Sequence, residues 1–578
     1  MAISSRLATP FHQAADSYDV IIVGSGYGGG VSASRLARAG LRVAVLERGR
    51  EVITGEFPAR FPEMRKEMRV TGNNIAVGSE QGLYDVRLGD DMHVLVGCGL
   101  GGGSLINAGV ALRPDDRVFQ DPVWPGPIAD DGLLDKGYQL ARQWLAPARD
   151  ADAFGHTKVK AFAAAAAALT NKAGAPDDRI APDGLVAPEL AVSFEDGISA
   201  GGITQPACTR CGDCCGGCNV GAKNTVAMTY LPDAVRHAAA LFTGAKVSHI
   251  EKSADGGWQV HARDMTPPDK NQETERVLTA RHVILSAGTL GSTEILLRSR
   301  DKGLTVSGRL GERFSANGDI IAFGYDTDLP VNAVGVGEPI KQGLEPVGAA
   351  VSAQLEINDD TRLEHSLCVQ EGVLPSSLAP MLPVMFVPNG RLLGALKSLI
   401  SGVYKGPLSR LQTFFAVSHD TAAGRFELER DQLALKWPNA KDEPVYQRLD
   451  AVLDKLVTQI GGAYVKNPLA GTVMGHQPAT AHPLGGCGMG DDASTGVVDH
   501  KCRVFSGSAH GASVHDGLYV IDGAIIPRSL GVNPLLTITA LAERAMLHFA
   551  TDHDLALQHT PATAKAPVLA TEPGHIRA

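Results

Sequence analysis

Short runs of apolar residues, separated by glycine-rich turns, mark the first regular structure in the chain. Residues 19–24 and 41–47 are two such runs, and residues 31–40 between them repeat apolar positions at helical spacing. Short continuous apolar runs are typical of strands that are buried on both faces of a parallel sheet. Gly40 stands where the end of a helix commonly carries glycine. The pattern predicts a strand, a glycine-rich turn, a helix and a second strand.

Further along the chain, the period of the hydrophobic pattern changes. Residues 161–169 are rich in alanine and predict a helix. Residues 258–262 and 276–280 alternate between apolar and polar, as antiparallel strands do. The apolar run at 283–288 predicts another buried strand, and residues 289–297 after it have helical spacing. Together these segments predict a mixed α/β fold.

Residues 330–470 differ in character because prolines interrupt their apolar stretches. Two of these stretches are Leu374–Val387 and Leu392–Tyr404. One interpretation is that they form the core of a second domain. The alternative is a mobile apolar cover over a hydrophobic substrate, able to make peripheral contact with a membrane. Prolines recur after residue 554, and we expect residues 554–578 to be a disordered tail.

Composition and charge exclude several kinds of protein. The 578-residue chain is 44% hydrophobic and contains 66 glycines, as expected for a globular protein with many tight turns. Its formal net charge is −10 and it has no dense block of Lys and Arg, so we expect no nucleic-acid partner. No apolar run reaches the roughly 18–20 residues that span a bilayer. The first ten residues lack the apolar core of an export signal, which predicts a cytoplasmic protein.

A dinucleotide-binding motif occupies the first predicted turn. Its glycines are Gly24, Gly26 and Gly29, placed directly after a strand and at the start of a helix. Gly24 suits the tight turn, Gly26 lets the backbone approach a pyrophosphate, and Gly29 lets the helix pack on the strand. The first N–H groups of the helix then face the phosphates. Glu47 follows Gly24 by 23 residues, close to the expected place of an acidic residue that binds ribose hydroxyls.

Three further segments carry candidate chemistry. Residues 97–107 form a second glycine-rich turn, Gly97-Cys-Gly-Leu-Gly-Gly-Gly-Ser104-Leu-Ile-Asn107, where bare backbone can lie against a flat ring system. His482 opens the sequence His-Pro-Leu-Gly-Gly-Cys, and Asn533 stands on a Gly/Pro-flanked turn that leads into a helix. A neutral imidazole, whose unperturbed pKa is near 6.5, suits proton exchange near neutral pH.

With these motifs, the chain resembles the glucose–methanol–choline family of FAD-dependent oxidoreductases. The resemblance rests on Gly24–Gly29 with Glu47, on residues 97–107, on Ser286–Ser292 and on the His482 and Asn533 segments. The last two segments are most similar to the cholesterol oxidase branch. The family implies a Rossmann-type FAD-binding domain interleaved with a substrate domain that is built on an antiparallel sheet with helices.

The resemblance also implies a division of the chain into parts. The FAD-binding parts are residues 17–115, 226–329 and 471–553, the last also catalytic; the substrate-domain parts are 116–204 and 330–470; a cysteine-rich loop spans 205–225. FAD would be bound without a covalent link, since the 97–107 turn contains no histidine where some relatives attach their flavin. The residues implied to bind it, besides the first motif, are Gly97, Gly102, Ser104, Asn107 (near the isoalloxazine), Asp522 (near the ribityl chain) and Pro534.

The family further implies that His482 and Asn533 lie on the substrate side of the flavin. Alcohol oxidation removes a hydride from carbon and a proton from oxygen, so a base or hydrogen-bond partner must manage that proton. His482 would be the base or orienting group and Asn533 the hydrogen-bonding partner, with nearby His476 a weaker candidate. The Pro-interrupted stretches of residues 330–470 indicate an apolar alcohol, a sterol or fatty alcohol, oxidised to ketone or aldehyde by hydride transfer to flavin N5.

Five of the nine cysteines fall within residues 208–218. Cys208, Cys211, Cys214 and Cys218 have the C-x2-C-x2-C-x3-C spacing of bacterial ferredoxin ligands. All four would hold a [4Fe–4S] cluster, or three of them a [3Fe–4S] cluster. Zinc, a redox-active dithiol pair and purely structural cysteines are the alternatives. Asn219 departs from the ferredoxin pattern, which has proline at that place.

The electron acceptor depends on that loop. An iron–sulfur cluster beside a flavin favours a dehydrogenase that passes electrons to a small carrier, a quinone or a cytochrome. The alternative is an oxidase that reduces O2 directly, with a zinc-bound or metal-free loop. The sequence also leaves open an electron-transfer flavoprotein in which His482 is incidental, and a membrane-surface protein anchored by residues 374–404. We expect the isolated cysteines to pack as small hydrophobic residues; they are Cys98, Cys368, Cys487 and Cys502.

Overall fold

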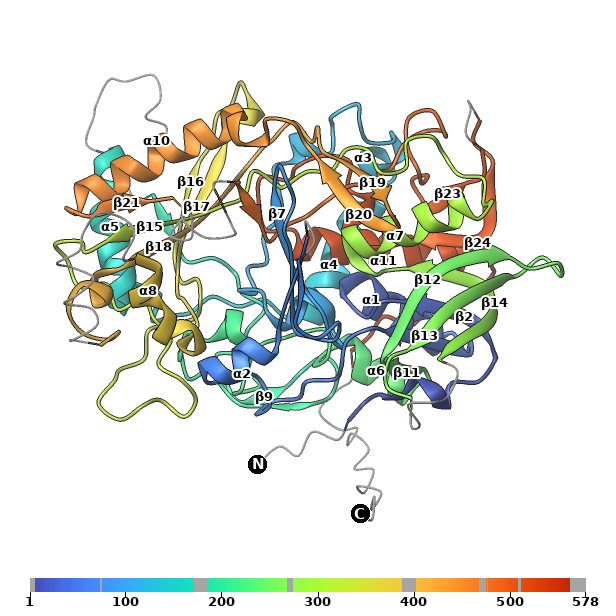
Figure 1. Ribbon diagram of the computed structural model, residues 1–578, viewed down its shortest axis with the longest axis horizontal. Helices are drawn as coiled ribbons and strands as arrows, with labels where there is room; N and C mark the ends of the chain where they lie inside the picture. Colours follow the sequence, from blue (N-terminus) through green and yellow to red (C-terminus); the bar gives the residue numbers. More distant parts are fainter. Residues whose placement is uncertain are drawn as a thin grey trace, which may run out of the picture.

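The computed structural model describes residues 6–72, 75–170, 184–267, 274–386, 402–466, 475, 477–507 and 511–561. Two lobes lie side by side, each built around its own sheet (Figure 1). One lobe carries a nine-stranded sheet and the other a six-stranded sheet. A five-stranded sheet lies between them. The mixed α/β fold expected from the hydrophobic pattern is confirmed.

The nine-stranded sheet is parallel at its centre and antiparallel in two outer branches. Its strands are β1 (Thr9–Pro10), β2 (Ser17–Val23), β3 (Val43–Glu47), β11 (Ala240–Thr243), β12 (Ala245–Lys252), β13 (Trp258–Asp264), β14 (Glu275–Leu285), β23 (Arg503–Phe505) and β24 (Val514–Val520). They are hydrogen-bonded in the order β1-β11-β3-β2-β14-β13-β12, with β24 joined to β14 and β23 to β24. Strand β3 is buried along its whole length, as a strand covered on both faces must be.

The strand–turn–helix–strand prediction for the N-terminal segment is confirmed. Helix α1 (Tyr27–Arg38) joins β2 to β3, and Gly40 after it has a φ of +85°. The helix begins four residues before the predicted start, at residue 27 rather than 31. Glycines hide its first turn from the apolar pattern. They are required there because a Cβ at Gly28 would lie 1.7 Å from the carbonyl oxygen of Ile521.

The two strands predicted at 276–280 and 283–288 are one strand, β14. Its first half pairs antiparallel with β13, and its second half pairs parallel with β2 and β24. The strand therefore passes from a half-exposed hairpin into the buried centre of the sheet. Its pattern changes from alternating to continuous at that point, which gives a single strand the appearance of two.

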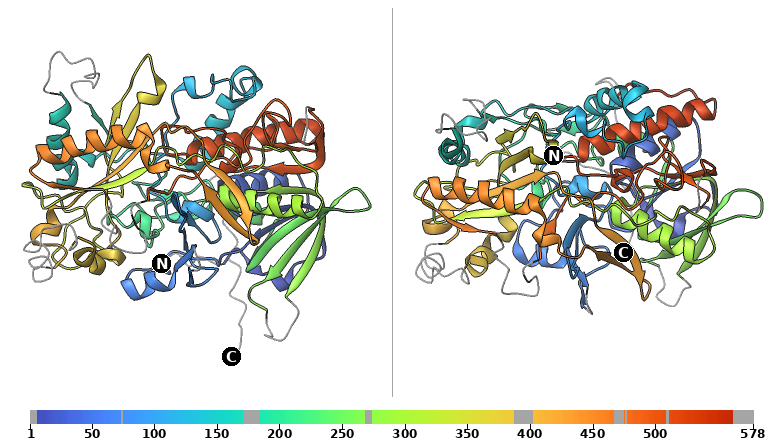
Figure 2. Two further views of the ribbon diagram at one scale, coloured as in Figure 1. Left: turned by 45° about the horizontal axis from the view of Figure 1, so that its top comes forward. Right: turned by 90° about the horizontal axis from the view of Figure 1, so that it is seen from above.

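Helices cover both faces of this sheet. One face carries α1, α6 (Tyr230–Arg236) and α11 (Leu535–Asp552), with α4 (Leu133–Leu145) packed against α11; α7 (Gly288–Asp301) lies on the opposite side (Figure 2). Arg35 of α1 and Glu543 of α11 form an ion pair in which both side chains are fully buried. Tyr230 of α6 donates a 2.9 Å hydrogen bond to Glu543. These contacts tie the first helix of the chain to the last.

The second lobe has an antiparallel sheet, in the order β21-β15-β18-β17-β16-β8. Its strands are β8 (Leu185–Val186), β15 (Ile320–Tyr325), β16 (Gln354–Ile357), β17 (Leu367–Gly372), β18 (Gln412–Ser418) and β21 (Ala463–Val465). Helices α5 (Thr157–Thr170) and α10 (Pro444–Gln459) pack against one another and against this sheet (Figure 1). Helix α5 contains the predicted alanine-rich helix.

The described part of the first Pro-interrupted stretch belongs to the core of this lobe. The turn Ser376–Met381 leads into α8 (Leu382–Phe386), and Leu382 and Phe386 are buried. Phe386 stacks on Tyr325 of β15, with ring centroids 5.2 Å apart. Core packing is therefore the correct interpretation for residues 374–386. Residues 387–401, which include most of the second stretch, lie outside the described residues.

The five-stranded sheet places two candidate segments next to each other. Its order is β22-β7-β6-β4-β5, with β4 (Met68–Gly72), β5 (Ile75–Val77), β6 (Tyr84–Arg87), β7 (His93–Gly97) and β22 (Ala479–Thr480). Strands β7 and β22 are parallel. The 97–107 turn follows β7 and His482 follows β22, so both leave the same end of this sheet. Among the described residues, the other strands and α-helices are the hairpins β9 (Gly197–Ile198) with β10 (Thr204–Gln205) and β19 (Arg425–Glu429) with β20 (Gln432–Lys436), and helices α2 (Phe61–Lys66) and α3 (Pro127–Asp130).

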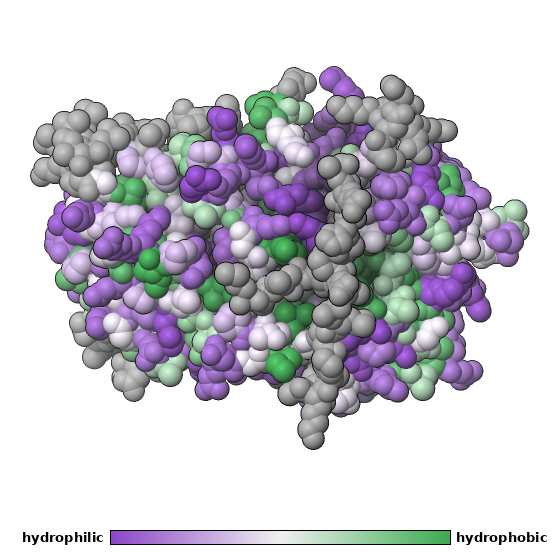
Figure 3. Space-filling view, turned by 90° about the horizontal axis from the view of Figure 1, so that it is seen from below, coloured by the Kyte–Doolittle hydropathy of each residue, from purple (hydrophilic) through white to green (hydrophobic). Residues whose placement is uncertain are grey.

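The surface carries scattered hydrophobic residues. Figure 3 shows one face, on which hydrophobic residues lie in small groups among hydrophilic ones. The exposed large hydrophobic residues come from distant parts of the chain; they are Val77, Phe154, Val186, Ile198, Val277, Ile321 and Leu329. In the described ranges, none of the helices has both the length and the apolar character needed to cross a membrane.

Candidate functional site

The first glycine-rich turn, between β2 and α1, is held by backbone contacts that leave no room for side chains. A Cβ at Gly24 would lie 2.3 Å from the carbonyl oxygen of Ser286, and one at Gly29 would lie 2.1 Å from that of Gly24. Gly26 is different, because a Cβ there would meet no atom within 4 Å. Gly26 therefore borders open space at the N-terminus of α1, where free backbone N–H groups favour an anion.

The second glycine-rich turn packs backbone to backbone on the first. A Cβ at Gly102 would lie 2.9 Å from Gly26 Cα, and one at Gly97 would lie 2.8 Å from Gly103 Cα. Gly101 N–H donates a 2.9 Å hydrogen bond to Ser25 Oγ in the first turn. Gly103, like Gly26, borders open space. The two turns together form one backbone-lined strip.

Glu47 lies at the end of β3 and is linked to the same strip. Its buried carboxylate accepts hydrogen bonds from Ser25 Oγ at 2.6 Å and from Gly49 N–H at 2.8 Å. Burial raises the pKa of Glu47, and the hydrogen bonds from Ser25 and Gly49 oppose that rise. An acidic side chain at the end of β3 and open glycine backbone at the start of α1 fit the ribose and the diphosphate of FAD.

Asn107 and Ser104 hold the second turn in shape. Asn107 Nδ2 donates to the hydroxyl of Tyr27 at 2.7 Å, which ties the turn to the start of α1. Ser104 Oγ donates to the carbonyl of Gly101 at 2.6 Å and accepts from Val226 N–H at 3.1 Å. Burial raises the pKa of Tyr27, so its hydroxyl stays neutral and available for hydrogen bonding.

Asp522 connects the C-terminal segment to α7. One carboxylate oxygen accepts from Gly288 N–H at 2.9 Å and from Ser292 Oγ at 2.5 Å; the other accepts from Ala524 N–H at 2.8 Å. Burial raises the pKa of Asp522 to about 6, although these hydrogen bonds favour the carboxylate. Pro534 is the N-cap of α11 and directly follows Asn533.

His482 lies just after β22 and beside a buried carboxylate. Its Nδ1 is 3.2 Å from Asp319 Oδ2, and the His482 side chain is 19% exposed while that of Asp319 is 3% exposed. The contact has the distance of an ion pair without the alignment of a hydrogen bond. Asp319 is fixed by Ala481 N–H at 2.8 Å and by Thr480 Oγ1 at 3.2 Å. The carboxylate therefore favours a proton on Nδ1 and leaves Nε2 as an acceptor.

Asn533 faces His482 from the turn before α11. Its Nδ2 lies 3.5 Å from His482 Nε2. Its Oδ1 accepts a 2.7 Å hydrogen bond from Nε2 of Gln370, a buried residue of β17. This bond fixes the direction of the Asn533 amide, because Gln370 donates through its amide nitrogen and so requires the oxygen of Asn533. The Asn533 nitrogen is thereby turned toward His482.

One short segment, Ser315–Asp319, positions both of these residues. Fully buried Asn317 accepts from Leu530 N–H at 2.8 Å and donates to the carbonyl of Val532 at 2.8 Å. These hydrogen bonds hold the loop that carries Asn533. Asp319, two residues later, accepts a hydrogen bond from the segment that carries His482. The segment is itself anchored by Asp420, which accepts from Ser315 Oγ at 2.7 Å and from Gly318 N–H at 2.9 Å.

The cysteine loop lies against the second lobe. The sulfurs of Cys208 and Cys214 accept backbone N–H groups of Arg210 at 3.3 Å and Ala350 at 3.4 Å. Burial raises the pKa of Cys208 and Cys211, and neighbouring cysteines of the loop raise both further. All nine cysteines are free. The isolated cysteines are buried, as expected; these are Cys98, Cys368, Cys487 and Cys502.

Buried Lys223 joins the cysteine loop to the second glycine-rich turn. Its ammonium group donates to the carbonyl oxygens of Leu105 at 2.8 Å and Asn107 at 2.9 Å. A third hydrogen bond, at 2.9 Å, goes to the carbonyl oxygen of Cys214. Burial lowers the pKa of Lys223, although the neighbouring cysteines act in the opposite direction. One side chain therefore touches both regions that the sequence marks for redox chemistry.

Sequence reasoning missed Asp319, Asn317, Gln370 and Lys223. The only signal near the first two is Asn317-Gly318, a dipeptide typical of tight turns, and Asn317 has the left-handed φ of +59° that such turns require. A turn signal does not reveal the partner of a side chain more than 160 residues away. His476 and residues 562–578, within the predicted tail, lie outside the described residues.

Comparisons with known proteins find relatives over most of the chain. Family models described as GMC oxidoreductase match residues 195–315 and 436–542, and one described as an FAD binding domain matches residues 19–54. A cholesterol oxidase of Mycobacterium tuberculosis (strain ATCC 25618 / H37Rv) is 28% identical over 91% of this chain and 90% of its own length. A long-chain-alcohol oxidase of Arabidopsis thaliana is 25% identical over 91% of this chain and 66% of its own. The crystal structure of pyridoxine 4-oxidase from Mesorbium loti has the same fold, with a TM-score of 0.59, 17% identity and coverage of 92% and 99% of the two chains.

The open space at Gly26 generates the first prediction. Gly26→Ala should fold normally but bind FAD about 10–100-fold more weakly, because a methyl group there displaces a charged phosphate from its backbone donors, a loss of about 1.5–3 kcal/mol. FAD titration of the deflavinated protein measures the change. Gly155→Ala, at an exposed glycine that also borders open space, is the matched control and should bind FAD as the parent protein does. Equal FAD affinity in Gly26→Ala would remove Gly26 from the binding site.

The second prediction concerns the hydrogen bonds between Asn317 and the loop that carries Asn533. Asn317→Asp keeps the acceptor for Leu530 N–H but loses the donor to Val532, leaving a buried carbonyl unpaired at a cost of about 1–3 kcal/mol. Displacement of the Asn533 loop should slow anaerobic flavin reduction by alcohol about 10–100-fold while FAD content stays constant. Asn332→Asp is the control, since Asn332 also has a left-handed φ, +56°, but is exposed. An unchanged reduction rate in folded Asn317→Asp protein would contradict the positioning role.

Proposed function

We propose that this chain, which matches GMC (glucose–methanol–choline) oxidoreductase models over residues 195–315 and 436–542, oxidises the hydroxyl group of a bulky or long apolar alcohol. The product is a ketone or an aldehyde. The observation that carries the proposal is the pairing of His482 with Asn533 across 3.5 Å, beside the carboxylate of Asp319. An electron-transfer flavoprotein needs no such pair.

The geometry of the pair suits an alcohol. Because Asp319 favours the proton on Nδ1 of His482, Nε2 presents a lone pair to the site. Asn533 presents an N–H group toward the same point. At 3.5 Å the two groups make a poor hydrogen bond with each other. A hydroxyl group satisfies both, donating its proton to His482 and accepting from Asn533.

The proton and the hydride leave the alcohol in different directions. His482 takes the hydroxyl proton, and Asp319 stabilises the imidazolium that results. Asn533, held by Gln370, keeps the alcohol oxygen in place as its negative charge develops. Bound FAD supplies the hydride acceptor at N5. Gly26, Gly103 and Glu47 are the groups that we assign to its diphosphate and ribose.

An apolar face beside Asn533 supports the substrate class. Gln370 pairs with Phe415 across β17 and β18, and Phe415 pairs with Ile321 of β15. Paired residues of an antiparallel sheet point to the same face, so these two apolar side chains share the face that carries Gln370 to Asn533. Ile321 is 36% exposed and Phe415 is half-buried. Relatives of the chain include enzymes named for cholesterol and for long-chain alcohols.

We propose a route by which the electrons leave the site. They would pass through an iron–sulfur cluster held by Cys208, Cys211, Cys214 and Cys218 to a small carrier, a quinone or a cytochrome. The ferredoxin spacing, the N–H groups donated to two of the sulfurs and the buried Lys223 support this assignment. The three hydrogen-bond acceptors of Lys223 are all carbonyl oxygens. A buried ammonium group needs a negative partner, and metal-bound thiolates supply one where neutral thiols do not.

The arrangement of the sulfurs bears on the alternative ion, zinc. No three of these described sulfurs lie within 4.8 Å of one another. Tetrahedral zinc with Zn–S bonds of about 2.3 Å requires sulfurs about 3.8 Å apart, so the loop would have to contract around it. A cluster holds its cysteines farther apart because several metal ions separate them. The alternative function remains an oxidase that reduces O2 directly, with a zinc-bound or metal-free loop.

Replacement of His482 tests the proposed chemistry. His482→Gln should lower the rate of anaerobic flavin reduction by a sterol or fatty alcohol by about 10²–10⁴-fold, because the base that takes the hydroxyl proton is lost. FAD content should not change. His12→Gln, at a half-buried histidine close to Asp264 of β13, should reduce flavin at the parental rate. Stopped-flow absorbance of the flavin gives the rates.

Two results would contradict this proposal separately. Unaltered flavin reduction in His482→Gln would leave the histidine incidental and favour an electron-transfer flavoprotein. A sugar or small polar alcohol that exceeds every sterol and fatty alcohol in kcat/KM by a wide margin would overturn the apolar substrate while leaving the chemistry intact.

The cysteine loop has its own test. Protein purified anaerobically should contain three or four iron atoms per flavin with matching acid-labile sulfide, and an EPR signal that changes on reduction with dithionite. Cys211→Ser should lose the iron, whereas Cys215→Ser, in the same loop but outside the ferredoxin spacing, should keep it. Zinc in place of iron, or no metal, would overturn the cluster and favour direct reduction of O2.

A further inference from the structure

Three metal-ligand side chains converge on the antiparallel edge of the nine-stranded sheet, away from the residues assigned to the flavin. They are His249 and Glu251 of β12 and His261 of β13. Their ligand atoms all lie within 4.8 Å of one another. His249 Nε2 is 3.3 Å from Glu251 Oε1, and His261 Nε2 is 3.6 Å from Glu251 Oε2. Their side chains are 11%, 42% and 23% exposed, in chain order, so an ion can reach them from solvent.

A β-bulge creates this arrangement. Val247 pairs with Ala262 and His249 with His261, so Ser248 is an extra residue in β12. Without the bulge, Ser248 would stand opposite His261 and His249 would turn to the other face. Bulges redirect side chains in this way, often at functional sites. Glu251 follows His249 by two residues and therefore shares its face.

The bulged residue also orients His249. Ser248 Oγ lies 2.9 Å from His249 Nδ1 and 3.3 Å from the carbonyl oxygen of His261. The serine has one proton, and a carbonyl can only accept. Both contacts are satisfied together when the hydroxyl donates to the carbonyl and accepts from N–H at Nδ1. His249 Nε2 then carries a lone pair, which faces a carboxylate oxygen of Glu251 at 3.3 Å.

His261 leaves a second ring nitrogen in the same place. Its Nε2 is buried and has no hydrogen-bond partner among the described residues. The two rings are nearly parallel, 14° apart, with centroids separated by 4.1 Å. Two ring nitrogens and a carboxylate thus converge on one point, an arrangement that a cation stabilises. Two imidazoles and one carboxylate are a ligand set that zinc uses in proteins.

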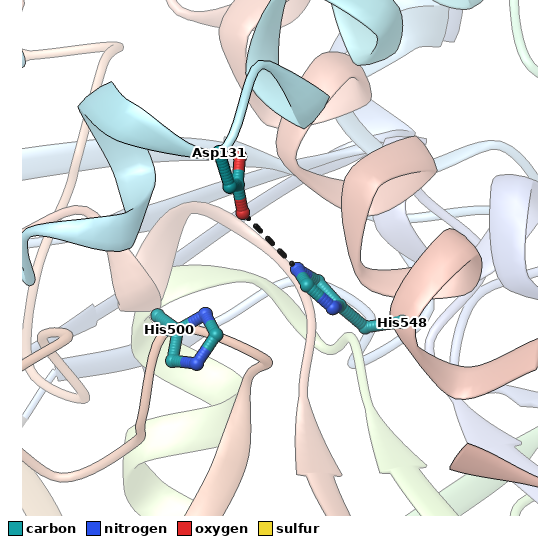
Figure 4. A group of neighbouring side chains, drawn as sticks. All are labelled: Asp131, His500 and His548. Carbon is teal, nitrogen blue, oxygen red and sulfur yellow. Dashed lines mark ion pairs between the residues drawn. The ribbon is translucent and has the colours of Figure 1, made fainter. Parts of the chain in front are cut away.

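A second group of ligand-type side chains, drawn in Figure 4, differs in one decisive respect. The ligand atoms of Asp131, His500 and His548 also lie within 4.8 Å of one another. Arg544 of α11, however, forms an ion pair with Asp131 and lies 3.2 Å from His500 Nδ1. A guanidinium cation therefore already occupies the place of an ion. At the β12–β13 group the neighbouring positive charge is Lys302, at the end of α7, which acts on His249 without forming a hydrogen bond to it.

We propose that His249, Glu251 and His261 bind one zinc-class divalent ion on the β12–β13 edge, with solvent completing its coordination. Ser248 is a positioning residue that fixes the tautomer of His249. The ion links the edge strand β12 to β13 and so stabilises the antiparallel edge of the sheet that binds FAD. The site is independent of the alcohol chemistry and of the cysteine loop.

Zinc titration of the metal-stripped holoenzyme tests the site. Calorimetry should show one equivalent of Zn²⁺ that is lost in His249→Ala and in His261→Ala, and that is retained in His548→Ala, the matched control in the Arg544-filled group. Ser248→Ala should weaken that equivalent about 10–100-fold, as loss of an orienting hydrogen bond does at other metal sites. Lys302→Gln should tighten it, because the repelling charge is gone. Saturating Zn²⁺ should raise the melting temperature of the parent protein more than that of His261→Ala.

Cobalt separates this site from the cysteines. Co²⁺ at the proposed site should give visible bands without the intense near-ultraviolet charge-transfer bands that thiolate ligands produce. Those visible bands should vanish in His261→Ala and persist in Cys211→Ser. Zn²⁺ isotherms that are identical in the parent protein and both histidine variants would overturn the proposal. So would loss of the equivalent in His548→Ala. Flavin reduction by alcohol is read separately, so failure of this site leaves the proposed function untouched.

Discussion

The candidate site depends on two buried polar side chains that stand two residues apart, Asn317 and Asp319. Each holds the backbone of a different distant loop, Asn317 that of residues 530–532 and Asp319 that of residues 480–482. Buried amide and carboxylate groups are costly unless they are hydrogen-bonded, so the loops and the segment fix one another. The distance between His482 and Asn533 is therefore a property of Ser315–Asp319 as much as of the loops themselves. Because this segment leads into β15, the second lobe takes part in placing groups that belong to the lobe of the nine-stranded sheet.

The sequence predicts well wherever backbone and local pattern decide the structure. The motif predicts a tight turn at Gly24 and close packing at Gly29, and a Cβ at either would lie within 2.3 Å of a carbonyl oxygen. The central strands follow from continuous apolar runs, and most of α1 follows from apolar positions at helical spacing. Strand β14 shows the limit of that reasoning, since one strand with two environments produces two patterns.

Side-chain partners far apart in the chain are beyond such reasoning. Nothing local to Asp319 indicates that it faces His482, which is 163 residues away, and nothing local to Gln370 indicates that it orients Asn533. Lys223 is adjacent to a motif, yet its function as a bridge depends on how the 97–107 turn folds over it. These contacts are set by packing between lobes. The sequence therefore predicts candidate reacting groups but not the groups that hold them.

A second histidine, His419, lies beside the loop that carries Asn533, and its surroundings are the reason why we propose His482 instead. His419 is 6% exposed, and a Cβ at Gly531 would lie 2.3 Å from its Nε2. Burial lowers the pKa of His419 to about 4, with the charge of Arg528 adding to the effect. A ring with that pKa is neutral at neutral pH and holds a second proton poorly, so it cannot serve as the base. It packs against the loop that presents Asn533. His482 is more exposed and has the carboxylate of Asp319 3.2 Å from its Nδ1, which is why we propose it, rather than His419, as the base.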